Sequence, residues 1–232
     1  MRNQLQVRNQ KFVPAFTLIE ILVVISIIAV LSALILATAG YAMSKARRSR
    51  VETELATLVS AIGSYKAAKG FYPQDNPNNY SMSPLFYELT GTTITVYNSS
   101  PPVPASYYSA TTGDTFNAMR APSDFFTVYG TGVTGFVNAS ADPSQVQNFF
   151  GATGKSARTG HLITNGVAYT ILGVVVQGPV QFATTNGSTI SPWFYNSSNP
   201  TNNPGSYDLW MDVYYSGKTN RISNWSQTPQ PQ

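Results

Sequence analysis

The 232-residue chain contains no cysteine and one histidine, and only 10% of its residues are charged. Without cysteine, the chain cannot form disulfides, thiolate metal ligands or cysteine nucleophiles. The sequence contains no G-x-S-x-G nucleophile motif that could act together with His161. We therefore expect His161 to be a bystander rather than a catalytic base, and the chain not to be an enzyme. An average soluble domain carries about 25% charged residues. The deficit indicates a polar, uncharged surface.

The net charge of +4 is unevenly placed along the chain. Three cations, Arg2, Arg8 and Lys11, precede the first apolar segment. From Phe16 onward, eleven Lys and Arg face ten Asp and Glu, which leaves a balance of about +1. Nucleic-acid binding needs a basic surface, so we do not expect a nucleic-acid partner.

A long apolar run extends from Phe16 to Ser44, and Glu20 is its only charged residue. A bilayer core is crossed by about 20 helical residues, whereas the apolar part of a signal peptide has only about 7–15. We therefore expect a single-pass membrane helix. A basic cluster follows it, composed of Lys45, Arg47, Arg48 and Arg50.

Cations flank both ends of the run, so flank charge alone does not fix its orientation. We expect the basic cluster to be a solvated collar at the membrane surface. The alternative is contact with acidic groups of neighbouring subunits.

Glu20 is the unusual residue of the run, because an ionised carboxylate is costly inside a bilayer. Two hypotheses account for it. In the first, Glu20 lies close enough to the headgroups to stay hydrated. In the second, a cut between Ala15 and Phe16 exposes an α-ammonium group, which is a cation near neutral pH, and Glu20 pairs with that group on a neighbouring chain.

The segment KFVPAFTLIEILVVISII, Lys11–Ile28, resembles the leader-peptide junction of type IV prepilins and type II secretion pseudopilins. The resemblance implies cleavage between Ala15 and Phe16 by prepilin peptidase, N-methylation of Phe16, and Glu20 as the assembly carboxylate. The family usually has Gly before the cut, where this chain has Ala15. Ala is the next smallest side chain, so we still expect cleavage.

Beyond the apolar run, apolar residues recur with helical spacing, which predicts an amphipathic continuation to Lys69. Gly70 fits a C-cap and Pro73 a stop signal. The predicted buried face comprises Val51, Leu55, Leu58, Val59, Ile62 and Tyr65.

Dense turn signals follow Phe71 and separate short β-prone runs. The predicted strands are Thr92–Asn98, Phe125–Tyr129, Val167–Gln177 and Asp208–Tyr215; short helices are expected within Met82–Leu89 or Pro143–Phe149. We expect an α+β fold in which an antiparallel sheet with long loops packs on the amphipathic helix. The expected parts are a leader (1–15), a membrane and assembly helix (16–44), a stalk helix (45–70) and a globular β domain (71–232).

Two further segments, Tyr65–Asp75 and Asn203–Trp225, are similar to G-type major pseudopilins. This resemblance implies a pilin fold and raises the question of calcium, which those proteins bind in their C-terminal loop. Here the corresponding loop, SGKTNRIS, contains two cations and no acid, and only Asp208 and Asp212 are near in sequence. Calcium needs six to eight oxygen ligands. We therefore expect no cofactor and no metal, and hydrogen bonds to turn amides for these two aspartates.

Taken with the resemblance, these features predict a filament subunit, most closely a G-like pseudopilin of a type II secretion system. The expected partners are other copies of the chain, prepilin peptidase, other pseudopilins and an inner-membrane assembly platform. The expected location is the bacterial inner membrane, with the C-terminal domain in the periplasm. Two alternatives stay open: a type IV pilin or competence-filament subunit for adhesion or DNA uptake, and a signal-anchored periplasmic binding protein or enzyme.

Overall fold

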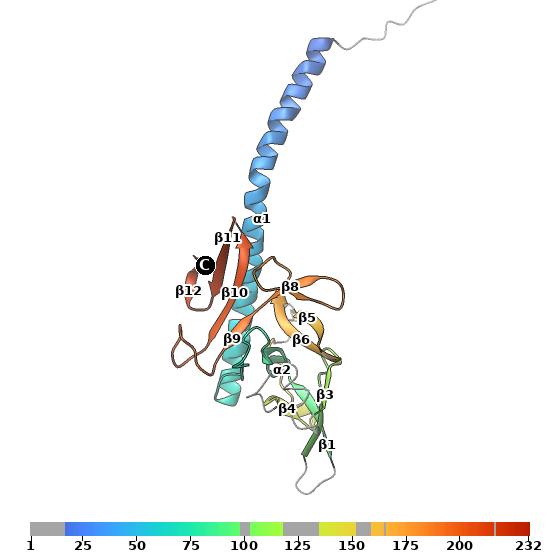
Figure 1. Cartoon of the computed structure of the whole chain (residues 1–232), viewed down its shortest axis with the longest axis vertical. Coiled ribbons are helices and arrows are strands. Elements are labelled where there is room, and N and C mark those ends of the chain that lie inside the picture. Colours follow the sequence, from blue (N-terminus) through green and yellow to red (C-terminus); the bar gives the residue numbers. More distant parts are fainter. Residues whose placement is uncertain (1–16, 98–102, 118–134, 152–158, 165, 216) are drawn as a thin grey trace, which may run out of the picture. The chain divides into compact units, whose positions relative to one another are not determined.

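The structure is a computed structural model that describes residues 17–97, 103–117, 135–151, 159–164, 166–215 and 217–232 (Figure 1). Its first element is α1 (Leu18–Lys69), a helix of 52 residues. Within the described residues this confirms the predicted long helix. The chain divides into two compact units, Met1–Met43 and Ser44–Gln232, and each is described by itself.

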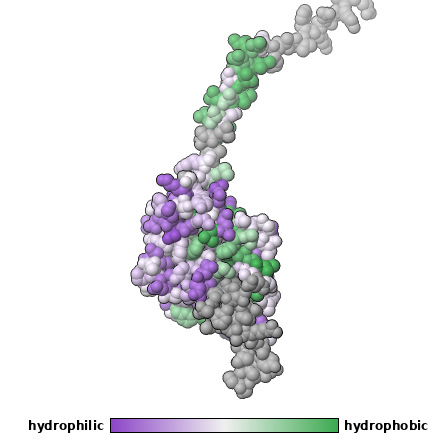
Figure 2. Space-filling model, viewed as in Figure 1, coloured by the Kyte–Doolittle hydropathy of each residue, from purple (hydrophilic) through white to green (hydrophobic). Residues whose placement is uncertain are grey.

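The described part of the first unit is the apolar portion of α1, from Leu18 to Met43. Its large apolar side chains between Leu18 and Ile35 are 49–82% exposed, and Figure 2 shows the resulting hydrophobic surface. At about 1.5 Å per residue this portion is about 39 Å long. The helix is therefore long and apolar enough to cross a bilayer.

The second unit holds three four-stranded sheets among the described residues, where the sequence predicted one. The first has the order β3-β2-β1-β4 and comprises β1 (Thr92–Tyr97), β2 (Val103–Tyr108), β3 (Thr115–Asn117) and β4 (Ala139–Ser140). The second has the order β5-β6-β8-β7 and comprises β5 (Thr159–Thr164), β6 (Val167–Val174), β7 (Phe182–Ala183) and β8 (Thr189–Pro192). Among the described residues, the strand pairings of these two sheets are antiparallel except that of β1 with β4.

The third sheet has the order β12-β11-β10-β9 and is built from the C-terminal segment. It comprises β9 (Phe194–Asn196), β10 (Asp208–Tyr215), β11 (Lys218–Ser223) and β12 (Ser226–Pro231), all antiparallel. Strand β12 is an outer edge of this sheet and contains Pro229 and Pro231.

Three of the four predicted strands are confirmed as β1, β6 and β10, and the fourth, Phe125–Tyr129, lies outside the described residues. The first predicted helix appears as α2 (Leu85–Thr90). The second is only a 3₁₀ turn, η1 (Pro143–Gln145), capped by the Asp142 carboxylate.

The hydrophobic core of the second unit contains the predicted face of the stalk part of α1. Val51, Leu58, Ile62 and Tyr65 are fully buried there. Val59 is 37% exposed, so its inclusion in the buried face was wrong. The alternation predicted for β10 is confirmed, because Leu209, Met211 and Val213 are buried in the same core.

The stalk part of α1 ends at a glycine C-cap. Gly70 has a φ of +86°, a left-handed conformation that glycine adopts without the steric cost of a Cβ. Its N–H donates to the Lys66 carbonyl at 2.9 Å, and Lys66 Nζ donates to the Gly70 carbonyl at 2.7 Å. The predicted cap is therefore confirmed.

Candidate functional site: the start of the apolar helix and the polar clusters of the sheet domain

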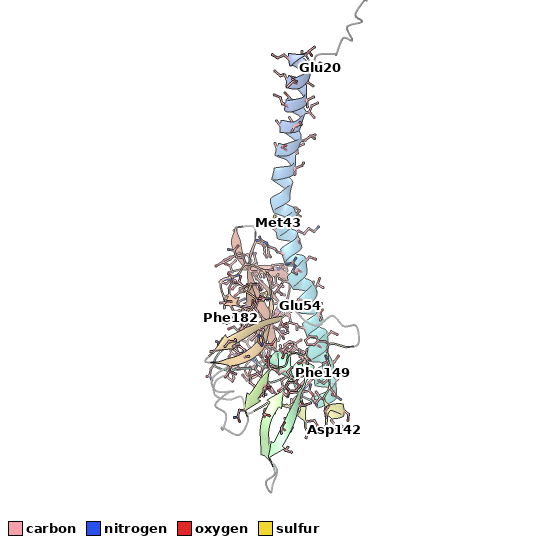
Figure 3. The ribbon with its side chains drawn as sticks, turned by 90° about the vertical axis from the view of Figure 1, so that its right-hand side faces the viewer. Glu20, Met43, Glu54, Asp142, Phe149 and Phe182 are labelled. Atoms are coloured by element: carbon pink, nitrogen blue, oxygen red, sulfur yellow. The ribbon has the colours of Figure 1, made fainter. Side chains whose placement is uncertain are left out.

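Glu20 lies in the first turn of α1 (Figure 3). It forms a capping box with Thr17. The Thr17 N–H and the Thr17 hydroxyl both donate to Glu20 Oε2 at 2.8 Å. In return, the Glu20 N–H donates to Thr17 Oγ1 at 3.3 Å. The first amides of a helix have no partner within it, and a capping box supplies two of them.

The capping box gives Glu20 a role that the two sequence hypotheses did not include. Its signal was present in the sequence, because T-x-x-E directly before an apolar run is the pattern of a capping box. The other carboxylate oxygen, Oε1, accepts no hydrogen bond within the described residues. Glu20 can thus cap its own helix and still accept a second partner. Ala15 and Phe16 lie outside the described residues.

Glu88 on α2 is a buried carboxylate that forms no ion pair with any cation in the described part of the chain. It is fully buried, and Oε1 accepts from the Val137 N–H at 2.7 Å and from Gln74 Nε2 at 2.8 Å. Oε2 accepts from the Asn138 N–H at 3.0 Å and from the Tyr65 hydroxyl at 2.9 Å. Burial raises the pKa of Glu88, against the opposing effect of these four donors. Glu88 therefore joins α1, α2 and the segment before β4.

Asp114 is a second buried carboxylate and the partner of the only histidine. Asp114 Oδ1 lies 2.7 Å from His161 Nε2, and His161 Nδ1 lies 3.3 Å from Thr185 Oγ1. The pairing joins β5 to the turn before β3, so His161 has a structural contact that the sequence did not indicate; that it is not a catalytic base stays a prediction. The two residues are 47 positions apart in sequence, so no local pattern reveals the contact.

The hydrogen bonds of Asp114 reach four parts of the sheet domain. Asp114 Oδ2 accepts from the hydroxyls of Tyr87 at 2.6 Å, Thr112 at 2.7 Å and Thr170 at 2.8 Å. Burial alone would raise the pKa of Asp114, but these hydrogen bonds and that of His161 outweigh burial and lower it. The cluster thus holds α2, the β2–β3 turn, β5 and β6 together.

The two aspartates weighed as calcium ligands are both occupied by donors of their own chain. Asp208 accepts the N–H groups of Thr201, Asn202 and Asn203 at 2.8–2.9 Å. Asp212 instead forms a bidentate ion pair with Arg221, with two N···O distances of 2.8 Å, so the predicted hydrogen bonds to turn amides were wrong for this residue. A calcium ion at either carboxylate would have to displace these donors, and within the described residues no group of three acidic or imidazole side chains gathers around a common point.

The two later segments that resemble G-type pseudopilins meet in the fold. Tyr72 packs on Tyr207, with ring centroids 5.1 Å apart, and its hydroxyl accepts from Ser206 Oγ at 3.2 Å. The first segment also anchors β9 and the loop after it. The Pro73 carbonyl accepts from the Tyr195 hydroxyl, and the Asp75 carboxylate accepts from the Ser197 N–H. The end of the stalk is thereby fixed to the C-terminal sheet.

The comparisons with protein-family models, curated proteins and solved structures returned no match for this chain.

Proposed function

We propose that the chain is a structural subunit of a helical filament, most closely a G-like pseudopilin of a type II secretion system. The observation that carries the proposal is the apolar helix from Leu18 to Ile35. Its side chains are exposed all around, and its one charge, Glu20, stands at its start. A helix without a polar face needs lipid or other apolar helices around it. A membrane-held subunit that later joins a filament has each of these surroundings in turn.

Glu20 supplies the specificity of this assembly. One carboxylate oxygen caps the helix through Thr17, which leaves Oε1 available to a donor from outside the chain. After cleavage at Ala15–Phe16, the methylated α-ammonium group of Phe16 on an adjacent subunit is that donor. A charge-assisted hydrogen bond is roughly twice as strong as a neutral one, and it removes the cost of leaving the carboxylate unpaired among apolar helices.

The resemblance to prepilins at Lys11–Ile28 and the contact between the two later segments support the family assignment. In this proposal the helix and sheets form a pilin fold, and the chain works as a mechanical part without cofactor or catalytic site. Prepilin peptidase trims the leader, and an inner-membrane platform adds the subunit to the filament. The domain after the helix stands in the periplasm. Nucleic acid is not a partner.

Mass spectrometry of the protein extracted from membranes is the first test. The proposal expects a mature chain that begins with methylated Phe16. An intact chain from Met1 would contradict it and would leave a signal-anchored periplasmic protein as the alternative. Loss of secreted proteins on deletion, without loss of surface pili, would separate the secretion role from a type IV pilus role.

Three substitutions separate the two functions of the Thr17–Glu20 pair. Glu20→Gln removes the charge, but Gln also completes a capping box. Thr17→Val removes the capping hydroxyl and keeps the charge, and Glu20→Ala removes both. We expect all three variants to insert into membranes, with filament yield lost in both Glu20 variants and largely kept in Thr17→Val. Normal filaments from Glu20→Gln would show that capping, rather than charge pairing, is the role of this carboxylate.

A further inference from the structure

The basic cluster after the apolar run lies within one and a half turns of α1. Successive residues of an α-helix are about 100° apart around the axis, so Lys45, Arg47, Arg48 and Arg50 project in four different directions. Lys45 and Arg50 are exposed, and the two other arginines are half-buried. Such a ring suits surroundings that are anionic on every side. A single protein partner would instead favour cations on one face.

One of the four cations is neutralised within the chain. Arg48 Nε forms an ion pair with Glu52 Oε1 at 2.7 Å, one helical turn along α1. No ion pair to a described residue is formed by Lys45, Arg47 or Arg50. These three residues are here called the collar. The collar retains three positive charges in the folded chain.

A second copy of the chain offers few anions to the collar. Of the ten carboxylates, all but Asp124 lie in the described residues. Five of these are at most 7% exposed: Glu54, Asp75, Glu88, Asp114 and Asp208. Of the other four, Glu52, Asp142 and Asp212 already accept a hydrogen bond from Arg48, Ser144 and Arg221 of their own chain. Glu20 accepts from Thr17 through one oxygen, and the proposed function assigns its other oxygen to the amine of Phe16.

The described carboxylates of a second copy therefore complement the collar poorly, and anions from outside the protein complement it better. We propose that Lys45, Arg47 and Arg50 bind the phosphate groups of anionic phospholipids at the bilayer surface where the apolar run ends. Clusters of Lys and Arg beside a membrane-crossing helix attract such headgroups, and the attraction falls off within a Debye length of the surface. This inference rests on the membrane-held state of the proposed function.

Headgroup binding would give the collar a defined part in filament growth. While the subunit waits in the membrane, the collar fixes how far the helix is inserted. When the subunit is drawn into the filament, the phosphates must be released. Membranes richer in anionic lipid would then hold the subunit more firmly before assembly.

The absence of cysteine makes a direct test simple. Ser44→Cys in the full-length chain gives a single site for a fluorescent probe next to the collar. The labelled protein is reconstituted in phosphatidylcholine vesicles that contain phosphatidylglycerol. Quenching by nitroxide-labelled phosphatidylglycerol is then compared with quenching by nitroxide-labelled phosphatidylcholine. The ratio measures the enrichment of anionic lipid at the collar.

We expect an enrichment of about fivefold, reduced strongly in 0.5 M salt. Lys45→Gln/Arg50→Gln should lose most of it. The matched control, Lys69→Gln/Lys218→Gln, removes two charges elsewhere and should keep it. A ratio of one for the wild type, or an unchanged ratio in the collar variant, would overturn the proposal. If the ratio is one and the collar variant instead fails to form filaments, the collar binds a neighbouring chain.

This assay requires only that the chain is inserted in a bilayer. An uncut leader or a lack of filaments would refute the proposed function without changing the quenching ratio. A ratio of one in a chain that is correctly cleaved and assembled would refute only the lipid-binding role.

Discussion

The Tyr65 hydroxyl donates a hydrogen bond to the buried carboxylate of Glu88. Removing this one oxygen atom tests how the buried carboxylate is stabilised. Tyr65→Phe removes the hydroxyl and keeps the fully buried ring, which packs against Phe71 and Phe149. A hydrogen bond to a charged group contributes about 1.5–3 kcal/mol and one to a neutral group about 0.5–1.5 kcal/mol. The cost of the substitution therefore depends on whether Glu88 is ionised.

The pH dependence follows from the raised pKa of Glu88. Below the ordinary glutamate pKa, the carboxyl group is protonated in both the folded and the unfolded chain. As the pH rises, the unfolded chain releases its proton first, so the folded state loses stability until the pH passes the raised folded-state pKa. The Tyr65 hydrogen bond favours the ionised carboxylate and limits the rise in the pKa of Glu88. Tyr65→Phe therefore enlarges the loss of folded-state stability with rising pH. We expect a destabilisation of about 1 kcal/mol at pH 4, where Glu88 is protonated, and about 2–3 kcal/mol at an alkaline pH above its raised folded-state pKa.

Urea unfolding of the full chain in detergent, followed by tryptophan fluorescence, measures both values. Tyr195→Phe is the matched control, because Tyr195 is also fully buried and its hydroxyl donates to a neutral acceptor, the Pro73 carbonyl, at 2.9 Å. Its cost should be about 1 kcal/mol at both pH values. If the cost of Tyr65→Phe does not grow with pH beyond that of the control, Glu88 does not receive a charge-assisted hydrogen bond and the reasoning is wrong.

Three further substitutions are predicted to destabilise the sheet domain by different amounts. Gly91→Ala should lower stability by at least about 2 kcal/mol in thermal unfolding, because Gly91 has a φ of +78° and a Cβ there would lie 2.2 Å from Val146 Cγ1. Gly113→Ala, with a φ of +80° but open space around it, should cost only about 1 kcal/mol; equal costs would contradict the steric explanation. Asp208→Asn should cost about 1–3 kcal/mol at neutral pH. Although burial favours the neutral form, hydrogen bonds from three turn amides lower the pKa of Asp208. Its stabilisation is therefore present above the ordinary aspartate pKa and is lost as the pH falls through the lowered one. Melting curves at pH 7 and pH 3 should show the difference shrinking in acid, and an equal loss at both would exclude an ionic role.

The spacing of apolar residues predicted those helices and strands in which one face is buried and the other exposed. The long helix, its glycine cap and the alternation in β10 follow from spacing alone. Val59 was placed on the wrong side because it lies at the border of the apolar stripe, where spacing cannot distinguish a covered residue from an exposed one. The division into three sheets depends on pairings between distant segments, which single strands do not specify.

The polar clusters were harder to predict for a related reason. A buried Glu88 or Asp114 is possible only because donors from several other segments converge on it, and those donors are ordinary Tyr, Thr, Gln and backbone groups. The apolar neighbours of Glu88 indicate that α2 is buried, but no residue next to Glu88 or Asp114 reveals these donors. Thr17 is the opposite case, because its capping role could be predicted from four consecutive residues.

The edge strand β12 affects whether closely packed copies of the chain associate through their sheet edges. An exposed sheet margin with a full row of amide donors invites another chain to add a strand. Pro229 and Pro231 each lack an N–H, so along β12 this row is interrupted twice within the last three residues of the strand. A densely packed array of such molecules is thereby protected against growth into amyloid-like ribbons.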